Sequence, residues 1–194
     1  MKYLNLTADT LAAYIVEQYR TMIETELDEI TIQHIKAAAT GLAETKRWGL
    51  IAAGQTGNGK TTLLKALNYA LNLAHKEYDP GENLRKYYSV MFRTAKQFAE
   101  QIKNPEDVAE VAALGFVFID DLGEEPTNVQ RYGNTMTPII DLIERRYESK
   151  AYTFISTNLN YTQIVDKYGA RIADRIVEMC HAVKYNNASY RQPN

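Results

Sequence analysis

The chain of 194 residues contains only one cysteine, Cys180, and it carries almost no net charge. A single cysteine excludes an internal disulfide framework and is typical of a reducing compartment. The net charge of −2 excludes a global basic field, so any nucleic-acid site must be a local patch. No apolar run approaches the length of a membrane span, and polar residues interrupt the N-terminal stretch too often for a signal peptide. We therefore expect a cytoplasmic protein without membrane attachment.

What the sequence does have is an alternation of short apolar runs and amphipathic stretches. Its composition, 45% hydrophobic and 24% charged, is that of an ordinary globular protein with one α/β core. Apolar runs predict strands at 48–53, 87–92, 116–120 and 151–156. Helical periodicity predicts helices at 7–27, 31–46, 60–76, 95–102, 104–113 and 137–150, and then two short helices split at Gly169. Strands separated by helices predict a parallel sheet that helices cover on both faces.

Capping residues stand before several of these helices. Side chains that accept a hydrogen bond from the first helical turn favour this position, and proline is well tolerated directly after it. The candidates are Thr7 or Asp9, Thr94, Asn104 with Pro105, Thr137 with Pro138, and Asn160.

The stretch GQTGNGKTT joins the first predicted strand to a strongly amphipathic helix. It matches the phosphate-binding loop pattern, in which glycines let successive backbone N–H groups surround a phosphate at a helix N-terminus. We expect Lys60 to contact the β- and γ-phosphates of a nucleotide and the Thr61 hydroxyl to bind Mg²⁺. The residues predicted to bind ATP in this stretch are Gly54, Gln55, Thr56, Gly57, Asn58, Gly59, Lys60, Thr61 and Thr62.

Two acidic residues end the third predicted strand, in FVFIDDLGEE. Acids at this place lie at the carboxyl edge of the sheet, where ligands bind in open α/β folds. We expect Asp120 to hold Mg²⁺ and Asp121 to act as general base toward the attacking water. Asp121 is one methylene shorter than the glutamate that is usual there, which leaves the rate of hydrolysis open. The simpler alternative is a pair of acids that only ends a strand in solvent.

The fourth predicted strand delivers Thr157 and Asn158 to the same edge. A polar side chain there can contact the γ-phosphate or the attacking water. Of the two residues we select Asn158 for this role.

Several arginines follow, and local sequence does not choose among them. Arg171 and Arg175 are spaced i, i+4 on one helix, where Asp174 and Glu178 are candidate ion-pair partners within the same helix. The functional alternative is that one of the two arginines reaches a nucleotide bound by a neighbouring subunit.

Three other arginines are open candidates. Arg191 could fold back onto the nucleotide of its own chain. Arg145 and Arg146 are expected either at a subunit edge or simply in solvent.

Taken together, these motifs give a family resemblance. GQTGNGKTT, DDLGEE, a YG pair at 132–133, ERRY, STNL, YGARIADRIVEM and a closing SYR follow one another over residues 48–191. In this order they resemble the AAA+ ATPases of the DnaC/DnaI helicase-loader and IstB transposition-helper group. The resemblance implies that Asp120 and Asp121 form the Walker B motif and that Asn158 is the first sensor. It also implies that Arg171 is a finger acting in trans and that Arg191 is the second sensor.

The fold implied by the resemblance is an α/β P-loop NTPase of AAA+ type. Its expected architecture is a three-layer sandwich with a parallel five-stranded sheet and a reduced or absent lid domain. We expect residues 1–47 to form an N-terminal helical segment and residues 48–194 to form the ATPase domain.

The function implied by the resemblance is slow hydrolysis of Mg-ATP by a helicase loader of the primosome. Its expected partners are a replicative DNA helicase and further copies of the chain through AAA+ interfaces. Single-stranded DNA is a weaker expectation, carried by tyrosines such as Tyr87 and Tyr88 that could stack on bases.

Two departures from the group weaken the DNA-loading role more than the ATPase role. Only about 47 residues precede the first strand, without a Cys/His cluster for zinc, and the segment 93–115 before the acids is short. Alternatives are a transposition helper and a nucleotide-gated binding module with negligible hydrolysis. A small-molecule kinase is disfavoured by Asn158 and the late SYR.

Overall fold

A computed structural model describes residues 6–78, 89–131, 133–187 and 189–190 of the chain. Its centre is a five-stranded, fully parallel sheet with the strand order β2-β3-β6-β1-β7. The strands are β1 (Gly49–Gly54), β2 (Val90–Thr94), β3 (Phe116–Leu122), β6 (Tyr152–Thr157) and β7 (Cys180–Tyr185). The order places β6 between β1 and β3, so the carboxyl ends of these three strands lie next to one another. A parallel five-stranded sheet was predicted, and it is confirmed.

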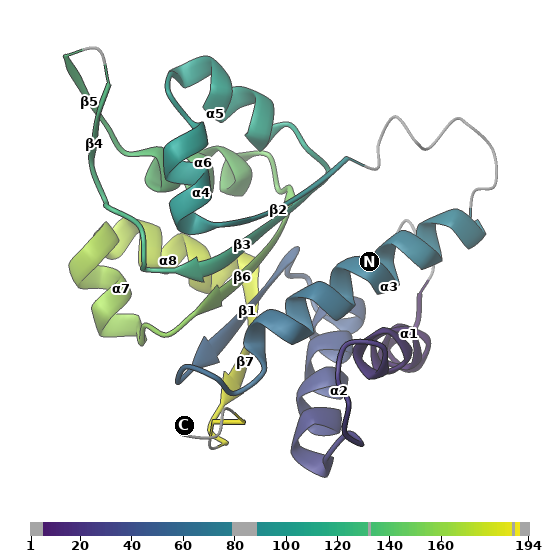
Figure 1. Ribbon diagram of the computed structural model, residues 1–194. Helices are drawn as coiled ribbons and strands as arrows, with labels where there is room; N and C mark the ends of the chain where they lie inside the picture. Colours follow the sequence, from purple (N-terminus) through teal and green to yellow (C-terminus); the bar gives the residue numbers. More distant parts are fainter. Residues whose placement is uncertain (1–5, 79–88, 132, 188, 191–194) are drawn as a thin grey trace.

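Helices cover both faces of the sheet, as Figure 1 shows. One face carries α1 (Ala8–Arg20), α2 (Glu29–Glu44) and α3 (Lys60–Tyr78). The opposite face carries α4 (Ala95–Gln101), α5 (Pro105–Ala112), α6 (Pro138–Glu148), α7 (Tyr161–Tyr168) and α8 (Ala170–Met179). Among the described residues, no helix combines the length and the apolar character needed to cross a bilayer.

The two-residue period of β3 explains how one strand serves two cores. Phe116 and Phe118 point to the face of α3, whereas Val117 and Ile119 point to the face of α6 and α8. The ring of Phe118 stacks on that of Phe154 in β6 with centroids 4.5 Å apart. Because both faces of β3 are covered, its first four residues, Phe116 to Ile119, are all buried and form a continuous apolar run in the sequence.

Most helix starts follow the predicted caps. The side chains of Thr7, Thr94, Asn104 and Asn160 each accept a hydrogen bond from the third residue of the helix that follows. Thr137 differs: it makes no capping bond, and its hydroxyl donates instead to the Asp141 carboxylate at 3.0 Å.

Other elements differ from the prediction. The first helix ends at Arg20 rather than at residue 27, and the chain then crosses to the second helix, which begins at Glu29. The strand β7 and the hairpin of β4 (Val129–Arg131) and β5 (Asn134–Met136) were not among the predicted strands. The edge strand β7 is only partly buried and contains polar residues, so it has no continuous apolar run. It also follows directly on the helical pattern of α8, and the sequence therefore carries no separate strand signal. Tyr87 and Tyr88 lie outside the described residues.

The position of Arg146 differs from the one expected from the sequence. It was expected at a subunit edge or in solvent, yet its side chain is completely buried. The guanidinium donates to four neutral oxygens: the Thr153 hydroxyl (2.9 Å) and the carbonyls of Ala112 (3.0 Å), Leu114 (2.9 Å) and Tyr152 (2.5 Å). These bonds join α6 to the end of α5 and to the start of β6. Its neighbour Arg145 is exposed.

Candidate functional site

The phosphate-loop sequence forms a tight loop between β1 and α3. Lys60 is the first residue of α3, only 5% exposed, and its ammonium lies inside the loop. Its Nζ donates to the carbonyls of Gly54 (2.8 Å) and Gln55 (2.6 Å) and to Asn58 Oδ1 (3.1 Å). Gly59 has a φ of +100°, and a Cβ there would lie 2.8 Å from the Tyr19 hydroxyl, so only glycine fits. A cation, a helix N-terminus and a glycine loop together form an anion cradle.

The acidic end of β3 is irregular, and this irregularity aims both acids at the site. The register of β3 with β6 shifts between Ile119 and Leu122, and Asp121 has a φ of +53°. In a regular strand two successive side chains would point to opposite faces. Here Asp120 contacts the phosphate loop, and Asp121 lines the neighbouring cavity.

Asp120 is bound to two hydroxyl groups. Its Oδ1 accepts hydrogen bonds from Thr61 Oγ1 at 2.9 Å and from Ser156 Oγ at 2.5 Å. Ser156 in turn accepts the backbone N–H of Asp121 at 2.8 Å. Mg²⁺ commonly takes one or two protein oxygens and fills its remaining positions with water or phosphate. The Thr61 hydroxyl and the Asp120 carboxylate are hard oxygen donors of this kind, so the pair fits Mg²⁺.

Asn158 and Thr157 have different surroundings. Thr157 is fully buried, and its hydroxyl donates to the Leu122 carbonyl at 2.7 Å and accepts from the Leu159 N–H at 3.0 Å. Asn158 lines the cavity, and its buried Oδ1 has no hydrogen-bond partner among the described residues. A buried acceptor without a partner is costly, so a polar ligand in the cavity would satisfy it.

The cavity has a volume of about 760 Å³, and its far wall comes from the N-terminal segment. Ile23, Leu27 and Asp28 lie on this wall, in the connection between α1 and α2. Tyr190 closes one side: its hydroxyl donates to Asp28 Oδ2 at 2.8 Å, and its N–H donates to the Gly57 carbonyl at 2.9 Å. The sequence patterns did not predict this wall, because nothing local links these segments to the loop.

Two groups of the wall have shifted pKa values. Burial raises the pKa of Tyr19 to about 12, so its hydroxyl stays a neutral donor toward the Gly59 carbonyl at 3.5 Å. Burial opposes ionisation of Asp28, but hydrogen bonds from Thr31 and Tyr190 outweigh it and hold the pKa of this carboxyl below its usual range. Asp28 therefore stays charged, and it caps α2 and binds Tyr190 at the same time.

The structure brings together most of the predicted site residues. Those that line the cavity are Thr56, Gly57, Gly59, Lys60, Thr61, Thr62, Asp121 and Asn158. Gly54 and Gln55 line a different cavity, of about 1040 Å³, and Asn58 is fully buried. Asp120 is not among the lining residues, but it accepts a hydrogen bond from Thr61, which is. Arg171 is not among the lining residues, and Arg191 lies outside the described residues.

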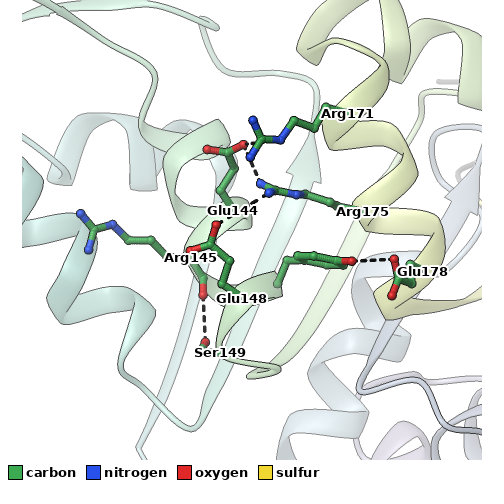
Figure 2. Close-up of polar contacts among 8 residues, drawn as sticks. Glu144, Arg145, Glu148, Ser149, Arg171, Arg175 and Glu178 are labelled. Carbon is green, nitrogen blue, oxygen red and sulfur yellow. Dashed lines mark hydrogen bonds and ion pairs between the residues drawn. The ribbon is translucent and has the colours of Figure 1, made fainter.

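Arg171 and Arg175 point from α8 toward Glu144 and Glu148 of α6, as Figure 2 shows. Both helices lie on the face of the sheet opposite to α3. Arg171 Nε is 3.4 Å from Glu144, and Arg175 is 2.6 Å from Glu144 and 3.7 Å from Glu148. The expected partners within the helix, Asp174 and Glu178, instead accept hydrogen bonds from tyrosines. The prediction of partners within α8 was therefore wrong, because α6 supplies closer carboxylates. The Arg171 side chain is 71% exposed, against 12% for Arg175.

Solved structures with a similar fold include DnaI, the DnaC helicase loader and the replication initiator DnaA. The crystal structure of DnaI has a TM-score of 0.62 and 21% identity, and the match covers 96% of this chain and 95% of that one. The DnaC helicase loader has a TM-score of 0.57 and 18% identity, with 84% and 93% covered. The replication initiator DnaA, bound to AMPPCP and single-stranded DNA, has a TM-score of 0.57 and 17% identity, with 91% and 50% covered.

No curated protein matches the chain. The family model described as IstB-like ATP binding protein matches residues 2–194. Because this match spans nearly the whole of the sequence, the chain belongs to the family of IstB-like ATP-binding proteins.

Proposed function

We propose that the protein hydrolyses Mg-ATP as an AAA+ ATPase and loads a replicative DNA helicase. The observation that carries the ATPase proposal is the meeting of Lys60, Asp121 and Asn158 at one cavity, from three different strand ends. A cation for phosphates, a carboxylate for a water molecule and an amide without a partner are the groups that phosphoryl transfer to water needs.

Each residue has a distinct part in this proposal. Lys60 exchanges its contacts with the loop carbonyls for contacts with the β- and γ-phosphates. Thr61 and Asp120 hold Mg²⁺, which when bound neutralises charge on the phosphates. Asp121 takes a proton from the attacking water, and Asn158 orients that water or the γ-phosphate.

The two proposed arginine contacts differ in origin, because Arg171 would act on a neighbouring subunit and Arg191 on its own. Arg171 lies on the far face of the sheet from α3 and is largely exposed, which suits a finger that reaches the ATP of a neighbouring copy. Arg191, directly after the cavity residue Tyr190, is proposed to contact the nucleotide of its own chain. Self-association through such contacts would complete each site.

The loader role is supported by the similarity to DnaI and to the DnaC helicase loader over nearly their whole length. A second candidate, a helper ATPase in transposition, is supported by the match to the IstB-like family. Binding to single-stranded DNA belongs to the loader proposal, with the DNA-bound DnaA structure as its support.

Two measurements test the proposal. Phosphate release from ATP, with and without single-stranded DNA, must depend on Asp121; turnover that Asp121→Asn leaves unchanged would contradict the ATPase. Affinity capture from the native host then identifies the partner. A hexameric helicase retained with ATP and released with ADP supports the loader, whereas a transposase supports the second candidate. Nucleotide-dependent capture without turnover would instead support a nucleotide-gated module.

A further inference from the structure

Glu125, four residues after Asp121, is a buried carboxylate that the proposed reaction does not use. Its side chain is 2% exposed. Its Oε2 accepts the backbone N–H of Gly123 at 3.0 Å, and its Oε1 accepts the hydroxyl of Tyr168 at the end of α7. A motif residue of the acidic loop is therefore bound directly to a helix on the far face of the sheet.

Lys167 fastens the same loop from the same helix turn. Its Nζ donates to the carbonyls of Gly123 (2.7 Å) and Glu125 (2.6 Å). Gly123 has a φ of +116°, and a Cβ there would lie 2.8 Å from the side chain of Leu159, the residue after Asn158. The loop is thus enclosed between α7 and the end of β6. We call Glu125, Tyr168 and Lys167 the α7 clamp.

Stability alone is a weak reason for this arrangement. Removing a carboxylate from water costs several kcal/mol, and an apolar contact of similar volume often stabilises a protein as well or better. Burial and the contact with Glu125 raise the pKa of Tyr168, so its hydroxyl remains a proton donor to the carboxylate. The clamp instead fixes orientation, because hydrogen bonds to the Glu125 carboxylate hold the acidic loop and α7 in one relative arrangement.

The clamp stands between the two parts of the proposed reaction. On one side, Asp121 lines the ATP cavity and its carbonyl accepts the N–H of Glu124. On the other side, α7 ends at Tyr168, Gly169 turns the chain with a φ of +87°, and α8 begins at Ala170. Arg171 is the second residue of α8. Along the chain, Tyr168 is therefore three residues from the proposed finger Arg171, and Glu125 is four residues from the proposed base Asp121.

We infer that the α7 clamp is a positioning device: it sets the orientation of α8, and with it Arg171, according to the acidic loop of the same subunit. This inference rests on the proposed function. In this inference, Glu125 and Tyr168 couple the ATP site of one subunit to the arginine finger that the same subunit supplies to its neighbour.

Mixtures of defective subunits test the inference. A chain with Asp121→Asn can only donate a finger, and a chain with Arg171→Ala can only use one. Their mixture should regain ATP turnover. Adding Tyr168→Phe to the finger-donating chain removes one hydroxyl and keeps the ring. We expect turnover of the mixture to fall at least about tenfold, because misplacing a reacting group by about 1 Å costs up to about 10²-fold.

The matched control is Tyr161→Phe in the same finger-donating chain. Tyr161 also joins α7 to α8, but its hydroxyl donates to Asp174 of α8 at 2.8 Å rather than to a carboxylate of the acidic loop. This control should leave the regained turnover within about twofold, as expected for an exposed pair. Full turnover with Tyr168→Phe in the donor, or an equal loss with Tyr161→Phe, would overturn the inference.

Two further measurements keep the outcome interpretable. Thermal unfolding of each variant separates a lost orientation from a lost fold, and Glu125→Gln in the donor replaces Tyr168→Phe if that chain does not fold. If the mixture with an intact clamp regains no turnover, the proposed function fails at its trans-acting finger. If that mixture works and the clamp variants work equally well, only the inference fails.

Discussion

The polar groups of the cavity already bind one another before any ligand is considered. Lys60 donates to the carbonyls of its own loop, and Thr61 donates to Asp120. A phosphate and a metal ion would therefore replace existing contacts rather than fill unsatisfied ones, and this preorganisation lowers the entropic cost of binding. Asn158 Oδ1 differs from these groups, since it has no partner among the described residues.

Replacing Lys60 tests the cradle. We expect Lys60→Ala to abolish measurable ATP affinity in a calorimetric titration, because it removes the ammonium that lies inside the loop. Lys65→Ala is the control: it removes an exposed lysine from the same helix and should leave the affinity unchanged. Unaltered affinity of Lys60→Ala would contradict the phosphate-loop assignment.

Replacing each acid separately tests their roles. Asp121→Asn should leave Mg-ATP bound and slow turnover by about 10²–10⁴-fold, which is the usual contribution of a general base. Asp120→Asn should weaken the Mg²⁺-dependent part of ATP binding, because it removes charge beside Thr61. Titrations with and without Mg²⁺, together with phosphate release, separate the two effects. Parent turnover in both variants would show that neither acid acts as proposed.

At the scale of elements, two local features matter: an irregular strand end at the site and a buried arginine that anchors helices to the sheet. The bulge at the end of β3 turns Asp121 into the cavity while Asp120 reaches Thr61. At the opposite end of the same sheet, Arg146 joins α5, α6 and β6 through carbonyl groups. The first feature serves the site, and the second serves the fold.

Arg146 gives a prediction on stability. Arg146→Met keeps much of the apolar stem and leaves three buried carbonyls without their donor, so we expect the free energy of unfolding to fall by about 3 kcal/mol or more. The neighbouring Arg145→Met removes an exposed arginine and should change it by less than about 0.5 kcal/mol. Chemical denaturation measures both. Equal effects of the two substitutions would refute the anchoring role of Arg146.

At the scale of the whole molecule, the cavity at the phosphate loop and the proposed finger lie on different sides of the sheet. The connection between α1 and α2 forms a wall of the cavity, beside α3. Arg171 of α8 pairs with Glu144 of α6 (Figure 2), and these two helices lie on the other face. The proposed nucleotide cavity and the exposed arginine therefore lie on different sides of the chain, which is the arrangement that stacking of identical subunits would require.

Arg171→Ala tests this arrangement. We expect the variant to bind ATP with the parent affinity and to lose about 10³-fold or more in turnover, the size of other arginine-finger effects. Turnover of the parent should rise more steeply than protein concentration, since the site is completed only on assembly. Arg145→Ala, an exposed arginine on α6, is the control. If Arg171 only pairs with Glu144, its removal would cost little, as for other exposed ion pairs.

The local signals in the sequence identified the parts of the site. The phosphate loop, the acids after β3, Asn158 after β6 and four of the helix caps are patterns of neighbouring residues, and they depend on short-range physics alone: glycine conformations, strand periods and capping bonds. The parallel sheet also followed from the alternation of strands and helices. The roles of the individual site residues remain predictions that the variants above test.

Only the tertiary structure decided which of these parts meet. The strand order puts β6 between β1 and β3, and this neighbourhood brings Asn158 and Ser156 to the acids. The wall from the α1–α2 connection, the burial of Arg146 and the pairing of Arg171 with Glu144 join segments far apart in the chain. Such contacts depend on the packing of whole faces, where the nearest carboxylate or carbonyl in space outcompetes the nearest one in sequence.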